Sequence, residues 1–252
     1  MKNKDKKLDP LLLNMAASWS QKAYNKKNSG TIKIESKFSS TTVYIKKNNS
    51  IDVIAFRGTQ QGRDWLTDAF IVPIPYAGRL CHGGFTLAHR SVWKKILPHI
   101  NMKKRTLICG HSLGGALAEL SAAKLWKKHP NLNLVTFGKP NTFFKGFKRA
   151  MKLDNQLSCV HGSDLVATVP RLCYGASKSQ TMLYFANCGV DFINPDNLTR
   201  KEDRGSLEDR LTDHFMEGYT KRLGAYLKHQ NKKPSKAEIK ELEAIADELE
   251  NT

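Results

Sequence analysis

Short continuous apolar runs alternate along this chain with longer segments in which apolar residues recur every three or four positions. The short runs predict strands at residues 31–34, 41–45, 52–56, 106–109, 132–137 and 156–160. The longer segments predict a helix that follows an N-cap at Asp9, and helices at 86–97, 113–128 and 206–227. Strands that alternate with helices of this length are typical of right-handed crossovers. The pattern therefore predicts an α/β fold: a mainly parallel, twisted sheet with helices on both faces.

The length favours a single domain with a short extension. A chain of 252 residues is the usual size of one domain, or of one domain plus a tail. The helical pattern breaks at Asn231–Pro234, and Ser235 and Glu238 then form a capping box that opens a final helix. We therefore expect one domain over residues 1–230 and an acidic helical appendage over residues 231–252. The pattern weakens between Cys173 and Leu211, where no element is assigned in detail.

The charge is strongly basic and unevenly distributed. The chain carries 41 Lys and Arg against 23 Asp and Glu, a formal net charge of +18. Residues 235–252 contain two lysines and six acids, so the other 234 residues carry +22. Clusters of basic residues lie at 26–27, 46–47, 94–95, 103–105 and 127–128. Such a field attracts polyanions. Because no nucleic-acid motif accompanies it, we expect peripheral contact with an anionic membrane surface and no nucleic acid, although lysine pairs are equally common on ordinary solvated faces.

The features that bear on compartment favour the cytoplasm. The five cysteines are an odd number, lie far apart and form no C-x-x-C pair, which is typical of a reducing compartment. The basic residues of Met1–Lys7 resemble the start of a signal peptide, but Asp9 and Pro10 follow and the next apolar stretch is short. No apolar run reaches the roughly 18 to 20 residues that cross a bilayer. We expect a cytoplasmic protein, peripheral at membranes, with secretion as the less favoured alternative.

A candidate nucleophile follows the predicted strand at 106–109. Residues Gly110–Gly114 form a G-x-S-x-G motif with Ser112 at its centre, placed between a strand and a helix. A serine on such a turn has strained backbone angles, and residues two positions away must lack side chains; Gly110 and Gly114 meet that demand. The start of the helix presents free N–H groups and a partial positive charge to a developing oxyanion. The motif predicts that Ser112 is a nucleophile.

A serine nucleophile needs a base, and the base needs a carboxylate that fixes its tautomer. In α/β-hydrolases the acid and then the histidine follow the serine along the chain. The histidines after Ser112 are His161, His214 and His229. We favour His214, which lies at a loop-to-helix transition. Asp164 is favoured as the acid because it follows the strand at 156–160, and catalytic groups gather at the carboxyl ends of parallel strands. Asp191 is the alternative acid.

Together with further stretches, these motifs resemble the class 3 lipase family, also called fungal-type lipases. That family is an α/β-hydrolase group that includes triacylglycerol lipases, phospholipases A1 and feruloyl esterases. The matching stretches lie in the family's order between about residues 15 and 225, at 53–59, 64–68, 82–85, 110–118, 136–140 and 213–215. The resemblance implies an α/β-hydrolase fold and a serine esterase that needs no metal or organic cofactor.

The resemblance also implies roles for supporting residues. The backbone N–H groups of Thr59 and Leu113 correspond to the oxyanion hole of the family, and Asp68 corresponds to the acid that orients the oxyanion residue's hydroxyl. The family usually has Asp-Pro-Val-Pro after its strand, whereas this chain has Asp164–Ala167 with the sequence Asp-Leu-Val-Ala. This difference from the family pattern begins at Asp164, the residue predicted to be the catalytic acid.

The segment in which family members carry a lid is short here. About a dozen residues separate Asp68 from His82, and Pro73 and Pro75 discourage a helix between them. We therefore expect no full helical cover, and a cleft that is partly open. The apolar residues of this segment fit two interpretations, an ordinary strand and turn in the core or a rim that touches a membrane.

The sequence therefore predicts a hydrolase of lipid esters, a lipase or an enzyme like phospholipase A1 that forms an acyl-enzyme on Ser112. The basic charge favours phospholipid over neutral fat, because each Lys or Arg near an anionic surface contributes about 1 kcal/mol. Two alternatives are a lipase-like interaction module without activity and a carboxylesterase for substrates other than lipids. The expected partner is a lipid or ester substrate, and the sequence makes no prediction of oligomeric state.

Overall fold

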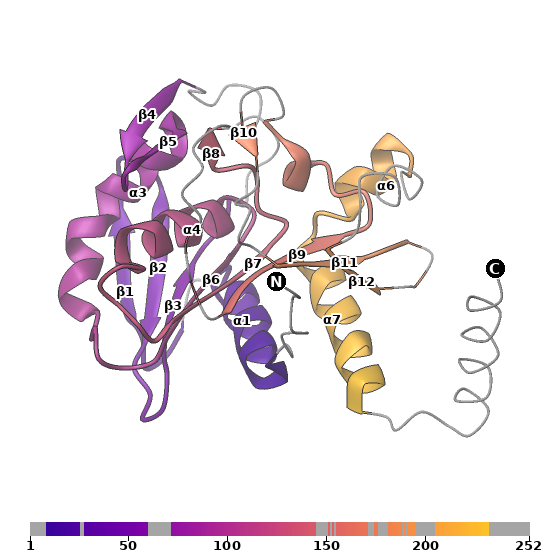
Figure 1. The fold of residues 1–252 in the computed structure, drawn as a ribbon, viewed down its shortest axis with the longest axis horizontal. Helices are drawn as coiled ribbons and strands as arrows, with labels where there is room; N and C mark the ends of the chain where they lie inside the picture. Colours follow the sequence, from indigo (N-terminus) through magenta and orange to yellow (C-terminus); the bar gives the residue numbers. More distant parts are fainter. Residues whose placement is uncertain are drawn as a thin grey trace, which may run out of the picture.

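The computed structural model describes residues 9–25, 28–59, 72–144, 151, 153, 155–170, 174–175, 181–187, 189, 191–194 and 205–231. Its centre is an eight-stranded sheet in the order β1-β2-β3-β6-β7-β9-β11-β12 (Figure 1). These strands are β1 (Ile32–Ser36), β2 (Thr41–Lys46), β3 (Asp52–Phe56), β6 (Thr106–His111), β7 (Leu132–Phe137), β9 (Asn155–His161), β11 (Thr181–Phe185) and β12 (Asp191–Ile193). The neighbours from β3 to β11 pair in parallel, and β1, β2 and β12 pair antiparallel at the two edges.

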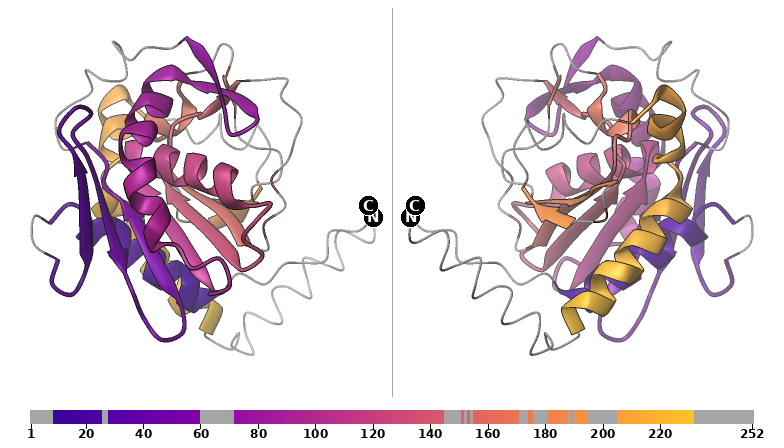
Figure 2. Two further views of the ribbon diagram at one scale, coloured as in Figure 1. Left: turned by 90° about the vertical axis from the view of Figure 1, so that its left-hand side faces the viewer. Right: turned by 90° about the vertical axis from the view of Figure 1, so that its right-hand side faces the viewer.

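Helices cover both faces of this sheet, as the alternating pattern predicted (Figure 2). Helices α3 (Gly83–Ile96) and α4 (Leu113–Leu125) pack on one face, and α1 (Pro10–Lys22) and α7 (Met216–Asn231) pack on the other. The shorter helices are η1 (Leu97–His99), η2 (Val166–Thr168) and α6 (Leu207–Thr212). The α/β prediction is therefore confirmed, with a separate hydrophobic core on each face.

The central strands are apolar without alternation because both of their faces are covered. Every residue of β3, β6 and β7 is buried, which is the pattern of strands in a parallel sheet between two layers of helices. Helix α4 is buried along almost its whole length, so it lies in the centre of its layer. The strand β6 and the helix α4 therefore hold the turn between them in a rigid, buried frame.

A second, four-stranded sheet lies beside the first and was not predicted. Its order is β10-β8-β5-β4, with strands β4 (Pro73–Tyr76), β5 (Arg79–His82), β8 (Phe143–Phe144) and β10 (Tyr174–Gly175). The predicted short lid partly falls here: residues 60–71, which include Asp68, lie outside the described residues, and β4 forms a strand rather than a helix. Val72 is 54% exposed whereas Tyr76 is buried. The segment thus begins at the surface and ends in the core.

The single helix predicted over residues 206–227 is wrong in its middle. A capping box of Ser206 and Asp209 starts α6, which ends at Thr212, and α7 begins only at Met216. At the break, the carbonyl oxygens of Asp213 and His214 lie 3.2 Å from His161 Nδ1 and 2.7 Å from His111 Nε2, so histidine side chains stand where helical N–H donors would be. Phe215, which falls within the predicted helix, is 60% exposed. The predicted helix beyond residue 234 lies outside the described residues.

Within the described residues, no helix combines the length and the apolar character that a membrane crossing requires.

Candidate active site

Ser112 occupies a strained turn between β6 and α4. Its φ of 56° and ψ of −131° are unusual for a residue with a side chain. A Cβ at Gly110 would stand 2.4 Å from the carbonyl carbon of Gly114, and one at Gly114 would stand 2.2 Å from the Phe56 oxygen. Both glycines are therefore required by close backbone contacts. The Ser112 N–H donates to the Phe137 oxygen at 2.9 Å, which fixes the turn against the end of β7.

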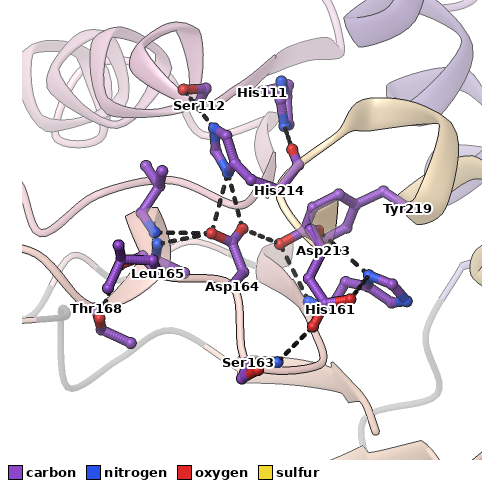
Figure 3. A network of polar contacts seen from close by, with 12 residues as sticks. His111, Ser112, His161, Ser163, Asp164, Leu165, Thr168, Asp213, His214 and Tyr219 are labelled. Atoms are coloured by element: carbon purple, nitrogen blue, oxygen red, sulfur yellow. Dashed lines mark hydrogen bonds and ion pairs between the residues drawn. The ribbon is translucent and has the colours of Figure 1, made fainter. Parts of the chain in front are cut away.

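The structure brings Ser112, His214 and Asp164 together from three separate parts of the chain (Figure 3). The Ser112 Oγ lies 2.8 Å from His214 Nε2. His214 Nδ1 lies 3.0 Å and 2.9 Å from the two carboxylate oxygens of Asp164. Since a carboxylate only accepts, Nδ1 carries the proton and Nε2 is free to accept the serine proton. This is the arrangement in which a serine hydroxyl is activated.

The Asp164 carboxylate is fully buried and receives further hydrogen bonds. The Tyr219 hydroxyl donates to Oδ2 at 2.6 Å, and the Val166 and Ala167 N–H groups donate to Oδ1 at 2.8 and 3.3 Å. Burial, and then the negative charge of Asp164, raises the pKa of Tyr219 well above 10, so its hydroxyl stays a donor. These donors compensate for the loss of water around the carboxylate. A Cβ on Gly138, whose φ is +51°, would lie 2.5 Å from Oδ2, so a side chain there would displace the carboxylate.

Asp213 ties the segment that carries His214 to the turn that carries Asp164. Its Oδ2 accepts from the Ser163 N–H, and its backbone oxygen lies 3.2 Å from His161 Nδ1. The Leu165 N–H also donates to the Arg210 oxygen at 3.1 Å. Burial is the main cause that raises the pKa of Asp213. Together these bonds fix the separation between the imidazole and the carboxylate.

His111 supports the backbone of His214 from the side of the nucleophile. Its Nε2 lies 2.7 Å from the His214 carbonyl oxygen, and its Nδ1 lies 2.7 Å from the Tyr24 hydroxyl. The carbonyl can only accept, so Nε2–H donates and Nδ1 accepts from Tyr24. Desolvation, with a smaller contribution from His214, lowers the pKa of His111 to about 3. His111 is therefore neutral in one tautomer and connects Tyr24, just after α1, with the Ser112 turn and His214.

The predicted oxyanion residues lie on segments that flank Ser112. Leu113 is the first residue of α4, where N–H groups have no partner within the helix. Thr59 follows Gly58, at which a Cβ would stand 2.7 Å from the His111 oxygen. The loop after β3 is therefore packed against the residue before Ser112. Asp68, expected beside Thr59, lies outside the described residues.

The structure does not place the alternative acid or the other candidate bases with Ser112. Asp191 pairs with Arg222 Nη2 at 2.8 Å. His161 Nδ1 lies 3.4 Å from Asp213 Oδ1. The side chain of His229 lies outside the described residues.

Sequence reasoning missed the roles of Tyr219 and His111. Tyr219 falls within the helix predicted over residues 206–227, and His111 is the variable second residue of the G-x-S-x-G motif. The sequence contains one signal for each residue. Tyr219 places a hydroxyl at a buried position of the helix, and His111 places an imidazole beside the nucleophile. Neither signal names a partner, because both partners are distant in sequence.

The comparisons with known proteins agree with this geometry. Residues 53–173 match the family described as "Lipase (class 3)". The secreted mono- and diacylglycerol lipase 1 of Fusarium solani is 29% identical over 140 residues, which are 49% of this chain and 40% of that protein. The secreted mono- and diacylglycerol lipase A of Penicillium cyclopium is 29% identical over 144 residues, 53% of this chain and 47% of that protein. The chain thus covers less than half the length of these curated relatives.

A solved structure supports the same assignment of the fold. The triacylglyceride lipase of Rhizomucor miehei aligns with a TM-score of 0.62 at 17% identity, over 81% of this chain and 90% of that one. Over residues 53–173 the chain thus matches the class 3 lipase family, and the structure has the α/β-hydrolase fold.

The expectation of a cytoplasmic location is contradicted. The similar lipases from Fusarium and Penicillium are named as secreted proteins. The cysteine argument failed for a physical reason. Cys81, Cys109 and Cys159 are buried, and a buried thiol acts as a small apolar side chain in any compartment.

The low pKa of His111 predicts a dependence of stability on pH. The unfolded chain binds a proton at this histidine below pH 6.5, whereas the folded chain does so only near pH 3. The free energy of unfolding therefore falls as the pH decreases below 6.5, by up to about 1.4 kcal/mol per pH unit from this group. His111→Asn should remove that contribution. Urea unfolding at pH 7, 6 and 5 measures both slopes, and equal slopes would contradict the burial of a neutral His111.

Proposed function

We propose that this protein hydrolyses lipid esters through an acyl-enzyme on Ser112. The observation that carries the proposal is the chain of contacts from Ser112 Oγ to His214 and from His214 to the buried Asp164. The family assignment supports it, since the similar proteins are named as lipases. In this proposal Ser112 is the nucleophile, His214 the base and Asp164 the acid that orients it.

The first chemical step transfers one proton and forms one bond. Ser112 Oγ attacks the carbonyl carbon of the ester while His214 Nε2 takes the hydroxyl proton. When the tetrahedral intermediate collapses, the bond to the alcohol oxygen breaks and His214 returns the proton to that oxygen. Water then attacks the acyl-enzyme by the same route, releases the fatty acid and restores Ser112. Asp164 stays ionised and stabilises the imidazolium in both steps.

The negative charge that develops on the carbonyl oxygen needs donors. We propose the N–H groups of Thr59 and Leu113 for this role, with Asp68 orienting the Thr59 hydroxyl. The N-terminus of α4 adds the positive end of the helix dipole beside Leu113. One donor of this kind typically contributes about 3 to 4 kcal/mol to catalysis.

A lipid substrate is favoured over a small soluble ester by the surface around the site. Three apolar side chains, on segments near the carboxyl ends of the parallel strands, are exposed: Phe38 by 86%, Phe215 by 60% and Val72 by 54%. Phe38 lies in the turn before β2, whose Thr42 oxygen accepts from the Arg57 N–H just after β3. Phe215 follows His214 directly. Exposed apolar residues at one rim are typical of contact with lipid or protein surfaces.

Between acylglycerols and phospholipids, we propose acylglycerols as the main substrates. The named activity of the Fusarium and Penicillium relatives supports this choice. Phospholipid is the second candidate because the chain carries a net charge of +18. However, the described basic clusters at 46–47, 94–95, 103–105 and 127–128 lie at the far ends of their strands and helices from Ser112. An anionic surface bound there would face away from the site.

The proposed roles of Ser112, His214 and Asp164 predict how far kcat falls when each residue is replaced. Ser112→Ala and His214→Ala should each lower kcat by several powers of ten and to a similar level, because the residues act as a unit. Asp164→Asn should lower kcat by about 10⁴ through the wrong histidine tautomer. Asp191→Asn should stay within a few fold of the wild type. Loss of hydrolysis in Asp191→Asn with retention in Asp164→Asn would show that the acid is misassigned.

Tyr219→Phe should test whether the hydroxyl positions Asp164. A hydrogen bond to a charged group contributes about 1.5 to 3 kcal/mol, so kcat should fall about ten- to hundredfold with KM unchanged. Tyr226→Phe, two turns further along α7, is the matched control and should keep kcat. If Tyr219→Phe lowers the melting temperature without changing kcat, the hydroxyl has only a structural role.

The placement of the basic clusters predicts a weak dependence on anionic lipid. Diacylglycerol dispersed in phosphatidylcholine vesicles should be hydrolysed at a rate that changes less than about threefold when a third of the lipid is replaced by phosphatidylglycerol, because the clusters do not face the substrate. Fatty acid release at low and high salt measures this. A rate that rises tenfold or more with phosphatidylglycerol, and falls with salt, would favour the phospholipase candidate instead.

A further inference from the structure

One long stretch of the chain is basic and almost free of acidic residues. Residues 72–144 contain 11 Lys and Arg and a single acid, Glu119. Glu119 is fully buried, and its Oε2 lies 3.1 Å from the Lys139 ammonium. No acid of this stretch is therefore available at the surface to neutralise its exposed lysines. The catalytic proposal uses none of this charge.

Several exposed lysines of this stretch lie at the amino edge of the parallel sheet. Hydrogen bonds join the loops there: Asn131 Nδ2 donates to the Lys103 oxygen, the Thr106 N–H donates to the Asn131 oxygen, and Lys104 Nζ donates to the Asn48 oxygen. Four exposed lysines on these loops and on the adjoining last turn of α3 have no carboxylate partner among the described residues: Lys94, Lys103, Lys127 and Lys128. We call these four lysines the basic edge.

The basic edge faces away from the proposed active site. Its loops precede β6 and β7, whereas Ser112 follows β6. A strand of this length spans about 20 Å. A substrate-bearing membrane that lay on the basic edge would hold Ser112 on its far side. The surface therefore fits a polyanion other than the substrate.

The acidic part of the chain follows an element that ends near this edge. Helix α7 starts beside His214 and runs 16 residues along the sheet, about 24 Å, toward the amino edge (Figures 1 and 2). The sequence then continues into residues 235–252, which lie outside the described residues and contain six acids and two lysines. In that sequence Ile239, Leu242, Ile245 and Leu249 recur with the spacing of one helical face.

We propose that the basic edge binds the acidic segment 235–252 of the same chain. The charges are complementary, since the segment carries −4 and the four lysines carry +4. The edge also offers apolar surface, because Leu97 is 42% exposed among these lysines and Trp126 is half-buried. As a helix the segment would be about 27 Å long. Helix α7 packs against β9, and three strand spacings, about 14 Å, separate β9 from β3. The segment is therefore long enough to cross from β9 to β3.

Zero-length carbodiimide cross-linking of the full chain, followed by mass spectrometry of the peptides, tests this contact. At low salt we expect links from acids of residues 238–250 to Lys103, Lys127 or Lys128. Because surface charges are screened by salt, the yield should fall at least fivefold in 0.5 M salt. Mixing heavy-isotope and light copies shows whether each link lies within one chain.

Charge reversal provides the matched controls. Lys127→Glu with Lys128→Glu should lower the yield at least fivefold, and adding Glu241→Lys with Glu248→Lys should restore it. The control variant Lys221→Glu with Lys228→Glu makes the same charge change on α7, which is closer in sequence to the acidic segment. It should leave the yield of links to the basic edge unchanged. Thermal unfolding confirms that each variant folds. Links mainly to Lys221 or Lys228, links between copies, or no links at low salt would each overturn the proposal.

Discussion

The arrangement of the site depends on one buried charge, the carboxylate of Asp164. It accepts hydrogen bonds from His214 Nδ1, the Tyr219 hydroxyl and two backbone N–H groups. An ionised carboxylate without such partners would cost several kcal/mol in the interior. Its donors come from the turn after β9, from the segment before α7 and from α7 itself. The need to satisfy this group therefore ties α7 and the segment before it to the turn after β9, and it brings His214 to Ser112.

Much of the fold could be predicted because its signals are local. The continuous apolar runs of β3, β6 and β7 and the periodic pattern of α4 follow directly from burial on both faces of a parallel sheet. The strands of the second sheet could not be predicted in this way. Phe143–Phe144 and Tyr174–Gly175 are two residues each, too short for any periodicity, and they form strands only because partners distant in sequence pair with them.

The residues of the site also differ in whether a local sequence signal predicts them. Ser112 could be predicted because the strained turn demands glycines at fixed positions, which the sequence displays. His214 and Asp164 followed from chain order and from the ends of strands, and the structure places both beside Ser112. The bonds of Tyr219 to Asp164 and of His111 to the His214 carbonyl join residues 55 and 103 positions apart. Hydrogen bonds of this kind leave no pattern in a single sequence. The break between α6 and α7 was missed for the same reason, since the backbone carbonyls there contact His111 and His161, which are distant in sequence.

The central claim is that the contacts of His214 make Ser112 a nucleophile, and covalent labelling with a fluorophosphonate tests it most directly. Such a probe reacts with a serine only when a base removes its proton and an oxyanion hole accepts the charge. The intact protein should be labelled on a single peptide that contains Ser112, and Ser112→Ala should not be labelled. Asp164→Asn should react far more slowly at equal concentration. A folded wild-type protein that the probe does not label, or equal labelling of Ser112→Ala, would contradict the account.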